Sequence, residues 1–126
     1  MKVVFDTYAW IEYFEGTKKG EIVERYLNES EIITPSIVLL ELSYKANKKG
    51  WDMKKCLSFI KIKSDIVGIN EQYILEFGKT YNTARSKIKN FGMVDAFILT
   101  ASRLNKAQIL TGDHHFSSFE NSIILD

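Results

Sequence analysis

Four acidic residues stand where a carboxylate can do chemistry: Asp6, Glu41, Asp95 and Asp113. Asp6 directly follows a short Val-rich run, and Asp113 follows another apolar run by one glycine. Glu41 interrupts an apolar helical stretch, and Asp95 opens another helical run. Carboxylates crowded together raise each other's pKa unless a cation neutralises them, and Mg²⁺ or Mn²⁺ prefers such oxygen ligands. The pattern predicts a metal-binding pocket.

Each acid also has a structural explanation. Asp6 and Asp95 can cap helices, and Asp113 after Gly112 is typical of a turn. We expect Glu41 to be buried or nearly so, because its helical neighbours on both sides are apolar. A buried carboxylate is costly unless it is paired, so a salt bridge to a lysine is the alternative to a metal.

Short β-type runs alternate with helical runs along the chain. Strands are predicted at residues 2–5, 31–34, 66–69, 108–111 and 122–125. Two short helices are predicted at 7–14 and 20–28. A third begins with Pro35 in its first turn and ends at about 48. Two more follow the capping residues Asp52 and Asn70, and the last runs from about 94 to 104. This alternation indicates an α/β fold, a three-layer α/β/α sandwich with a mainly parallel five-stranded sheet. Asp6 and Asp113 should lie at the same edge of that sheet, where ligands bind.

Bulk properties narrow the class of protein. The 126 residues predict one domain spanning 1–126, and no apolar run approaches the length of a membrane span. No export signal opens the chain, and the single Cys56 fits a buried thiol in a reducing compartment, so we expect a cytoplasmic protein. A net charge of +1 neither supports nor excludes RNA binding.

Four segments together resemble the acidic motifs of the PIN domain, in the family's order. They are residues 4–11 (VFDTYAWI), 34–42 (TPSIVLLEL), 92–101 (GMVDAFILTA) and 110–116 (LTGDHHF). The resemblance spans nearly the whole chain. It implies a ribonuclease whose metal ligands and catalytic groups are Asp6, Glu41, Asp95 and Asp113, with the hydroxyls of Thr7 and Thr111 supporting them.

The resemblance extends to toxins of the VapC kind. It implies an endoribonuclease that uses Mg²⁺ or Mn²⁺ to leave a 5′-phosphate and a 3′-hydroxyl, a cognate antitoxin that covers the active-site groove, and a homodimer. Some relatives carry a further acid two residues after the position of Asp113. This chain has His115 there, which predicts one firmly held metal ion and a second held more weakly.

The histidines and the basic residues lie outside the predicted acidic site. We expect His114 and His115 to lie in an exposed loop, outside the site, although a histidine beside Asp113 could act as a general acid–base group. Most lysines and arginines should lie on solvent-exposed faces of helices. The cluster after Glu41 could instead contact RNA phosphates, and it comprises Lys45, Lys48 and Lys49.

The first helix is aromatic on nearly every side, which indicates core or interface. We expect at least half of its aromatic side chains to be core, and part of that surface to meet the antitoxin or a second copy. A haloacid-type phosphatase is excluded, because Tyr8 stands where that class needs a second aspartate. A phospho-receiver domain is excluded as well, because Asn70 follows the third strand where that class needs an aspartate. The open alternatives are an RNA-processing nuclease that is no toxin, and a non-catalytic PIN-fold module that binds RNA or assembles with partners.

Overall fold

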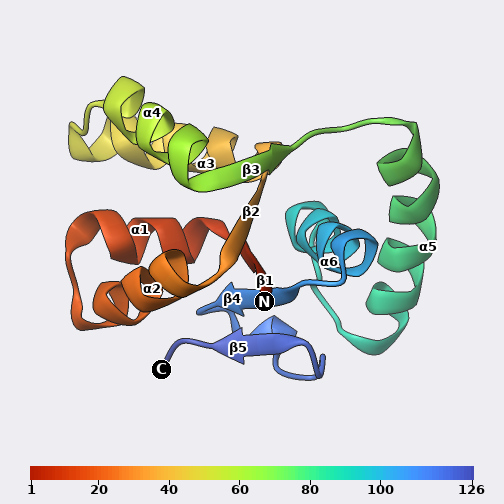
Figure 1. Ribbon diagram of the computed structural model, residues 1–126. Coiled ribbons are helices and arrows are strands. Elements are labelled where there is room, and N and C mark those ends of the chain that lie inside the picture. Colours follow the sequence, from red (N-terminus) through yellow and green to blue (C-terminus); the bar gives the residue numbers. More distant parts are fainter.

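The computed structural model describes residues 1–126 and contains five strands and six helices (Figure 1). The strands are β1 (Lys2–Phe5), β2 (Glu31–Pro35), β3 (Ser64–Val67), β4 (Gln108–Thr111) and β5 (Ser122–Ile124). The helices are α1 (Thr7–Glu15), α2 (Lys18–Glu29), α3 (Ser36–Lys49), α4 (Met53–Lys63), α5 (Glu71–Lys87) and α6 (Met93–Asn105), with a 3₁₀ turn, η1, at His114–Phe116.

All five strands are parallel and form one sheet in the order β3-β2-β1-β4-β5. Helices α1 to α4 cover one face of this sheet, and α5 and α6 cover the other (Figure 1). The predicted α/β/α sandwich is therefore confirmed. From β1 the chain first builds outward through β2 and β3, then crosses back to add β4 on the other side of β1. The carboxyl ends of β1 and β4 thus flank the switch point where ligands bind in open parallel sheets.

Local signals placed most element ends correctly. Asp52 caps α4 and Asn70 caps α5, each through a hydrogen bond from a backbone N–H of the first turn. Two predictions were wrong. Pro35 does not open α3 but ends β2 in extended backbone, with φ −63° and ψ 136°, so the helix begins at Ser36. The third strand is Ser64–Val67 rather than 66–69, because it pairs with β2 directly after α4.

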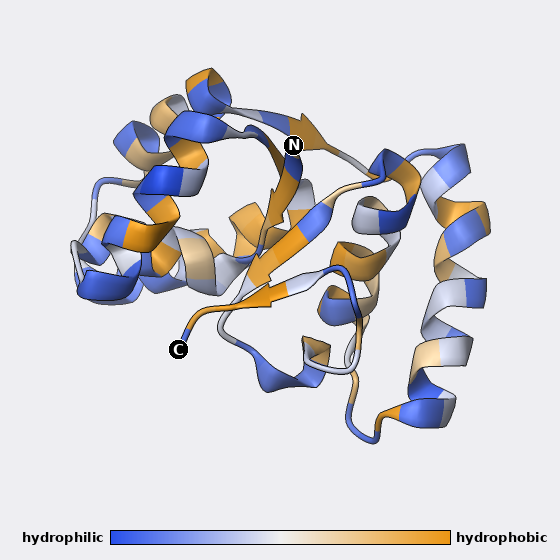
Figure 2. Ribbon diagram, turned by 60° about the horizontal axis from the view of Figure 1, so that its bottom comes forward, coloured by the Kyte–Doolittle hydropathy of each residue, from blue (hydrophilic) through white to orange (hydrophobic).

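The core lies on both sides of β1, whose Val3, Val4 and Phe5 are fully buried. Apolar residues concentrate on the strands and on the helix faces turned toward them (Figure 2). Trp10 of α1 is fully buried and its ring stacks on Phe14 at 5.8 Å. Tyr8, Tyr13 and Phe14 are only partly buried and pack against the core, so fewer of the aromatic side chains of this helix are core than expected. Cys56 is also buried. None of the helices has both the length and the apolar character needed to cross a membrane.

Helices α1 and α2 pack against each other at an unusually close crossing. Gly20 of α2 is buried, and a Cβ atom placed there would lie 2.2 Å from the carbonyl oxygen of Glu12 in α1. No atom other than hydrogen fits at that position, because the obstacle is backbone rather than a movable side chain. The close crossing fixes the start of α2 against the second half of α1, the helix that follows β1 directly.

Candidate metal-binding active site

A pocket of about 260 Å³ opens at the carboxyl ends of β1 and β4. All four predicted acids line it, and they arrive from four different elements. Asp6 follows β1, Glu41 lies in α3, Asp95 lies in the first turn of α6, and Asp113 follows β4. The remaining lining residues are Thr7, Tyr8, Val94, Ile98 and Gly112. The fold therefore brings the quartet together, and its role in binding metal stays a prediction.

Three of these carboxylates are each held by a backbone N–H. Asp6 Oδ1 accepts a hydrogen bond from Ala9 N at 2.8 Å, Asp95 Oδ2 from Gly92 N at 3.2 Å, and Asp113 Oδ1 from His115 N at 2.8 Å. The structural roles considered for these acids are thus real. They do not compete with a role in the pocket, because Asp95 and Asp113 each keep a second oxygen without a hydrogen bond from the protein. The backbone orients all three carboxylates and leaves Asp95 and Asp113 each with an oxygen free to bind.

Glu41 corrects one expectation. It is exposed rather than buried, and its neighbour Leu40 is 70% exposed, so the apolar stretch of α3 is not covered on all sides. No lysine pairs with Glu41. Its Oε1 instead accepts a hydrogen bond from the hydroxyl of Thr7, the first residue of α1. Thr7 therefore does support one of the acids, by tying α3 to the start of α1.

Burial and mutual repulsion disturb the charges in the pocket. Asp6 is only 5% exposed, and this desolvation, with the charges of Asp113 and Asp95, raises its pKa from 3.8 to about 7. Hydrogen bonding from the Thr111 hydroxyl and from the Ala9 amide opposes the rise. Burial also raises the pKa of Asp95, again with contributions from neighbouring acids.

The ligand set fits a hard divalent cation. Only three ion pairs occur in the chain, and none joins a lysine or arginine to any of the four acids. Four carboxylates without a lysine or arginine partner repel one another, and a cation removes that repulsion. Oxygen ligands from carboxylates are the kind that Mg²⁺ and Mn²⁺ prefer.

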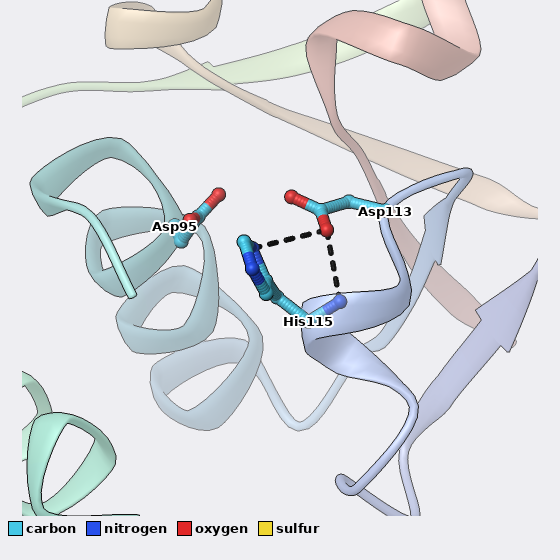
Figure 3. A group of neighbouring side chains, drawn as sticks. All are labelled: Asp95, Asp113 and His115. Atoms are coloured by element: carbon cyan, nitrogen blue, oxygen red, sulfur yellow. Dashed lines mark hydrogen bonds and ion pairs between the residues drawn. The ribbon is translucent and has the colours of Figure 1, made fainter. Parts of the chain in front are cut away.

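The sequence-based assignment missed His115. Its Nδ1 lies 3.2 Å from Asp113 Oδ1, and Asp95, Asp113 and His115 each offer a ligand atom within 4.8 Å of the others. Figure 3 shows the imidazole lying between the two carboxylates. His114, by contrast, is exposed and lies 3.4 Å from Asp126. Both histidines are exposed, as predicted, but His115 lies beside the acids whereas His114 does not.

The sequence also did not reveal that Tyr8 forms part of the pocket wall. Tyr8 lines the pocket, and its ring lies so close to Gly112 that a Cβ at that glycine would be 2.2 Å from Tyr8 Cε1. Lys19 of α2 donates a hydrogen bond to the Tyr8 hydroxyl at 3.0 Å, an interaction that raises the pKa of Lys19. The close crossing of α1 and α2 holds this pair. A sequence pattern does not reveal it, because it depends on that crossing.

The lysines proposed for RNA lie outside the pocket. Lys45, Lys48 and Lys49 follow Glu41 by four, seven and eight residues in α3, a spacing that puts them on its side of the helix. Lys48 and Lys49 are exposed, and Lys49 lies 3.9 Å from Glu15. They extend away from the acids along α3 as a basic strip.

Comparisons with known proteins identify the family and the fold. The sequence matches the PIN domain over residues 3–121. No curated protein sequence matches it significantly. Among solved structures, the fold is similar to a toxin–antitoxin complex from Klebsiella pneumoniae, with a TM-score of 0.76, 17% identity and 98% of each chain covered.

Two further structures show the same fold. One is VapBC2 from Rickettsia felis bound to a DNA fragment from its promoter, with a TM-score of 0.75, 18% identity, and 98% of this chain and 97% of that chain covered. The other is VapC20 from Mycobacterium tuberculosis, a Sarcin-Ricin loop cleaving toxin, with a TM-score of 0.68, 15% identity, and 94% and 95% covered. With the family match running from β1 to the residue before β5, the chain belongs to the PIN domain family.

Proposed function

We propose that this PIN domain is a metal-dependent endoribonuclease that hydrolyses RNA phosphodiester bonds with Mg²⁺ or Mn²⁺. One observation carries the proposal. Four carboxylates from four elements line one pocket at the switch point of the sheet, and none of them pairs with a lysine or an arginine. No serine or cysteine lines the pocket, so it contains no Ser–His or Cys–His nucleophile pair.

The residues divide into two proposed roles. Asp6 and Asp95 chiefly hold the cation, because their burial and raised pKa reflect the strongest need for neutralisation. A bound divalent cation lowers the pKa of water and offsets charge on the phosphoryl oxygens. Glu41 or Asp113 would orient the attacking water or complete the ligand set, with Glu41 positioned by Thr7. The Thr111 hydroxyl accepts a hydrogen bond from Asp113 N at 2.9 Å and so supports the carboxyl end of β4.

Cleavage of a labelled RNA tests the proposal. We expect cleavage with Mn²⁺ or Mg²⁺, none with EDTA, and a loss of at least about a hundredfold in Asp95→Asn, about 2.7 kcal/mol of the barrier. Asp52→Asn, a change at an exposed cap remote from the pocket, is the matched control and should retain activity. Cleavage that survives both EDTA and Asp95→Asn would refute it. Metal binding without any cleavage would favour the non-catalytic PIN module.

We further propose that the nuclease is the toxin of a toxin–antitoxin pair, acting on RNA in the cytoplasm. The fold's likeness to toxin–antitoxin complexes supports this. A cognate antitoxin and a second copy of the chain are the proposed protein partners. An apolar groove of about 210 Å³ beside the pocket is the kind of surface that such partners cover. It is lined by Ile37, Ile69, Ile74, Phe77, Met93 and Phe97.

Growth arrest on expression, abolished by Asp95→Asn, separates a toxin from a processing nuclease.

The basic strip on α3 is proposed to contact RNA phosphates. Replacing Lys45, Lys48 and Lys49 together by alanine should weaken RNA binding and reduce the slope of log affinity against log salt by about 2, since each phosphate contact on a single strand contributes about 0.7. Titrations of an uncleaved RNA at several salt concentrations measure this slope. Lys54, Lys55 and Lys61 of α4, replaced together, form the charge-matched control. An equal change in both triple variants would remove the specific role of α3.

A further inference from the structure

We propose that His115 is a metal ligand beside Asp95 and Asp113, and that its nitrogen makes the site prefer a first-row transition ion such as Mn²⁺ over Mg²⁺. The inference rests on the proposed function in one respect, namely that the pocket binds a divalent cation. It adds a residue and an ion preference that an all-carboxylate site would lack.

The chain fixes the position of His115 from both sides. On one side, its own backbone N–H donates to Asp113 Oδ1 at 2.8 Å, which makes Asp113 the cap of η1. On the other side, Phe116 is fully buried, with its ring 5.5 Å from that of Phe91. His115 is thus held between a capping residue and a core residue. Its side chain is directed to the pocket by this turn, although it is itself exposed.

The two histidines point in different directions. The side chain of His115 is 44% exposed and reaches Asp113, whereas that of His114 is 72% exposed and reaches Asp126 outside the pocket. Figure 3 shows the His115 imidazole facing the space between Asp95 and Asp113. The chain therefore carries its own control, because the sequence contains only these two histidines.

The three donors are close enough to share an ion. Their ligand atoms lie within 4.8 Å of one another. Two ligands about 2.1 Å from one ion are separated by about 3.0 Å when adjacent and about 4.2 Å when opposite. The gap to be closed is therefore about half an ångström, which a small side-chain rotation at His115 or Asp113 provides. His115 Nδ1 already lies 3.2 Å from Asp113 Oδ1, within that range.

The chemistry of the nitrogen sets the preference. Mg²⁺ favours oxygen ligands and keeps several waters, whereas imidazole suits transition ions, whose affinities for a mixed site rise from Mn²⁺ onward. An imidazole in the ligand set therefore weakens selection for Mg²⁺ relative to carboxylate alone. His115→Asp should shift the preference back toward Mg²⁺.

Electron spin-echo measurements on the Mn²⁺-loaded full chain test the ligand directly. A nitrogen bound to Mn²⁺ gives a strong ¹⁴N coupling, while a histidine that only hydrogen-bonds to a bound carboxylate gives a weak one. We expect the strong coupling in the unaltered protein and in His114→Ala, and its loss in His115→Ala. Weak or absent coupling in the unaltered protein would overturn the proposal, as would failure to bind Mn²⁺ at all.

Calorimetric titration provides the second readout. His115→Ala should lower the affinity for Mn²⁺ by at least about tenfold and should change the affinity for Mg²⁺ much less. Tenfold is the smallest loss usually seen when a residue that only supports a metal ligand is removed, so the loss of a ligand itself should be no smaller. Equal losses for both ions would overturn the preference. RNA cleavage, measured alongside, separates the two proposals. Cleavage without a nitrogen ligand removes only the role of His115, and a nitrogen ligand without cleavage removes only the ribonuclease.

Discussion

Replacing Asp6 by asparagine should stabilise the metal-free protein at pH 8 while abolishing RNA cleavage. The side chain is buried, and its pKa in the folded protein is about 7 against 3.8 for an ordinary aspartate. Since the folded state holds the proton more tightly, stability is fully present below pH 3.8 and is lost as the pH rises to about 7. At pH 8 the loss reaches up to about 4 kcal/mol, which the neutral amide avoids.

Denaturant unfolding in EDTA at pH 5 and pH 8 measures this effect. The advantage of Asp6→Asn should grow by about 2 to 3 kcal/mol between the two pH values, because the wild-type carboxyl loses its proton in that interval. The asparagine oxygen can still accept the hydrogen bond from Ala9 N, so α1 keeps its cap. Adding Mn²⁺ serves as the control and should stabilise the wild type far more than the variant. An advantage independent of pH would contradict the assignment of the charge penalty to Asp6.

Gly20→Ala should destabilise the protein by about 2 to 3 kcal/mol, because its new methyl group would lie 2.2 Å from the carbonyl oxygen of Glu12. Relief requires α2 to move away from α1. That movement would also separate Lys19 from Tyr8 at the wall of the pocket. Denaturant midpoints measure the loss of stability.

Gly78→Ala is the matched control for this prediction. Gly78 lies in α5 and is exposed, and no neighbouring atom lies within 4 Å of the position that a methyl group would take there. Alanine at this position should stabilise the chain by about 0.5 to 1 kcal/mol, since it favours the helical backbone. Both substitutions replace glycine by alanine in a helix. Stability changes of opposite sign would therefore assign the loss at Gly20 to the close crossing of α1 and α2. A loss at Gly78 as large as that at Gly20 would show that the crossing is not the cause.

The parts of the site that were predictable depend on topology. In a parallel sheet every strand points to the same edge, so a residue directly after a strand is placed by the strand alone. This is why Asp6 and Asp113 could be put at one edge. Strand order was not predictable, and it is the order that makes β1 and β4 neighbours. The start of β3 was misplaced by two residues, since pairing with β2 rather than local composition decides where that strand begins.

The errors concern the direction of side chains. Glu41 was expected to be buried because its neighbours in sequence are apolar, yet Leu40 beside it is also exposed. Apolar spacing along a helix does not tell whether another element covers each face. The adjacent His114 and His115 differ for a related reason: only the anchoring of η1 by Phe116 decides which of them faces the pocket. No periodic signal exists in a three-residue turn.

Three of the four acids are oriented by backbone N–H groups near the start of a helix or turn. Backbone amides do not depend on the residue type, so apart from the hydroxyl of Thr111 beside Asp6 the side chains around the pocket contribute little to orienting these carboxylates. Much of that surrounding surface is consequently free to diverge, provided that the strands and helix starts persist. A scaffold of this kind can acquire new substrates and partners by exchanging its rim while it keeps the same chemistry at its centre.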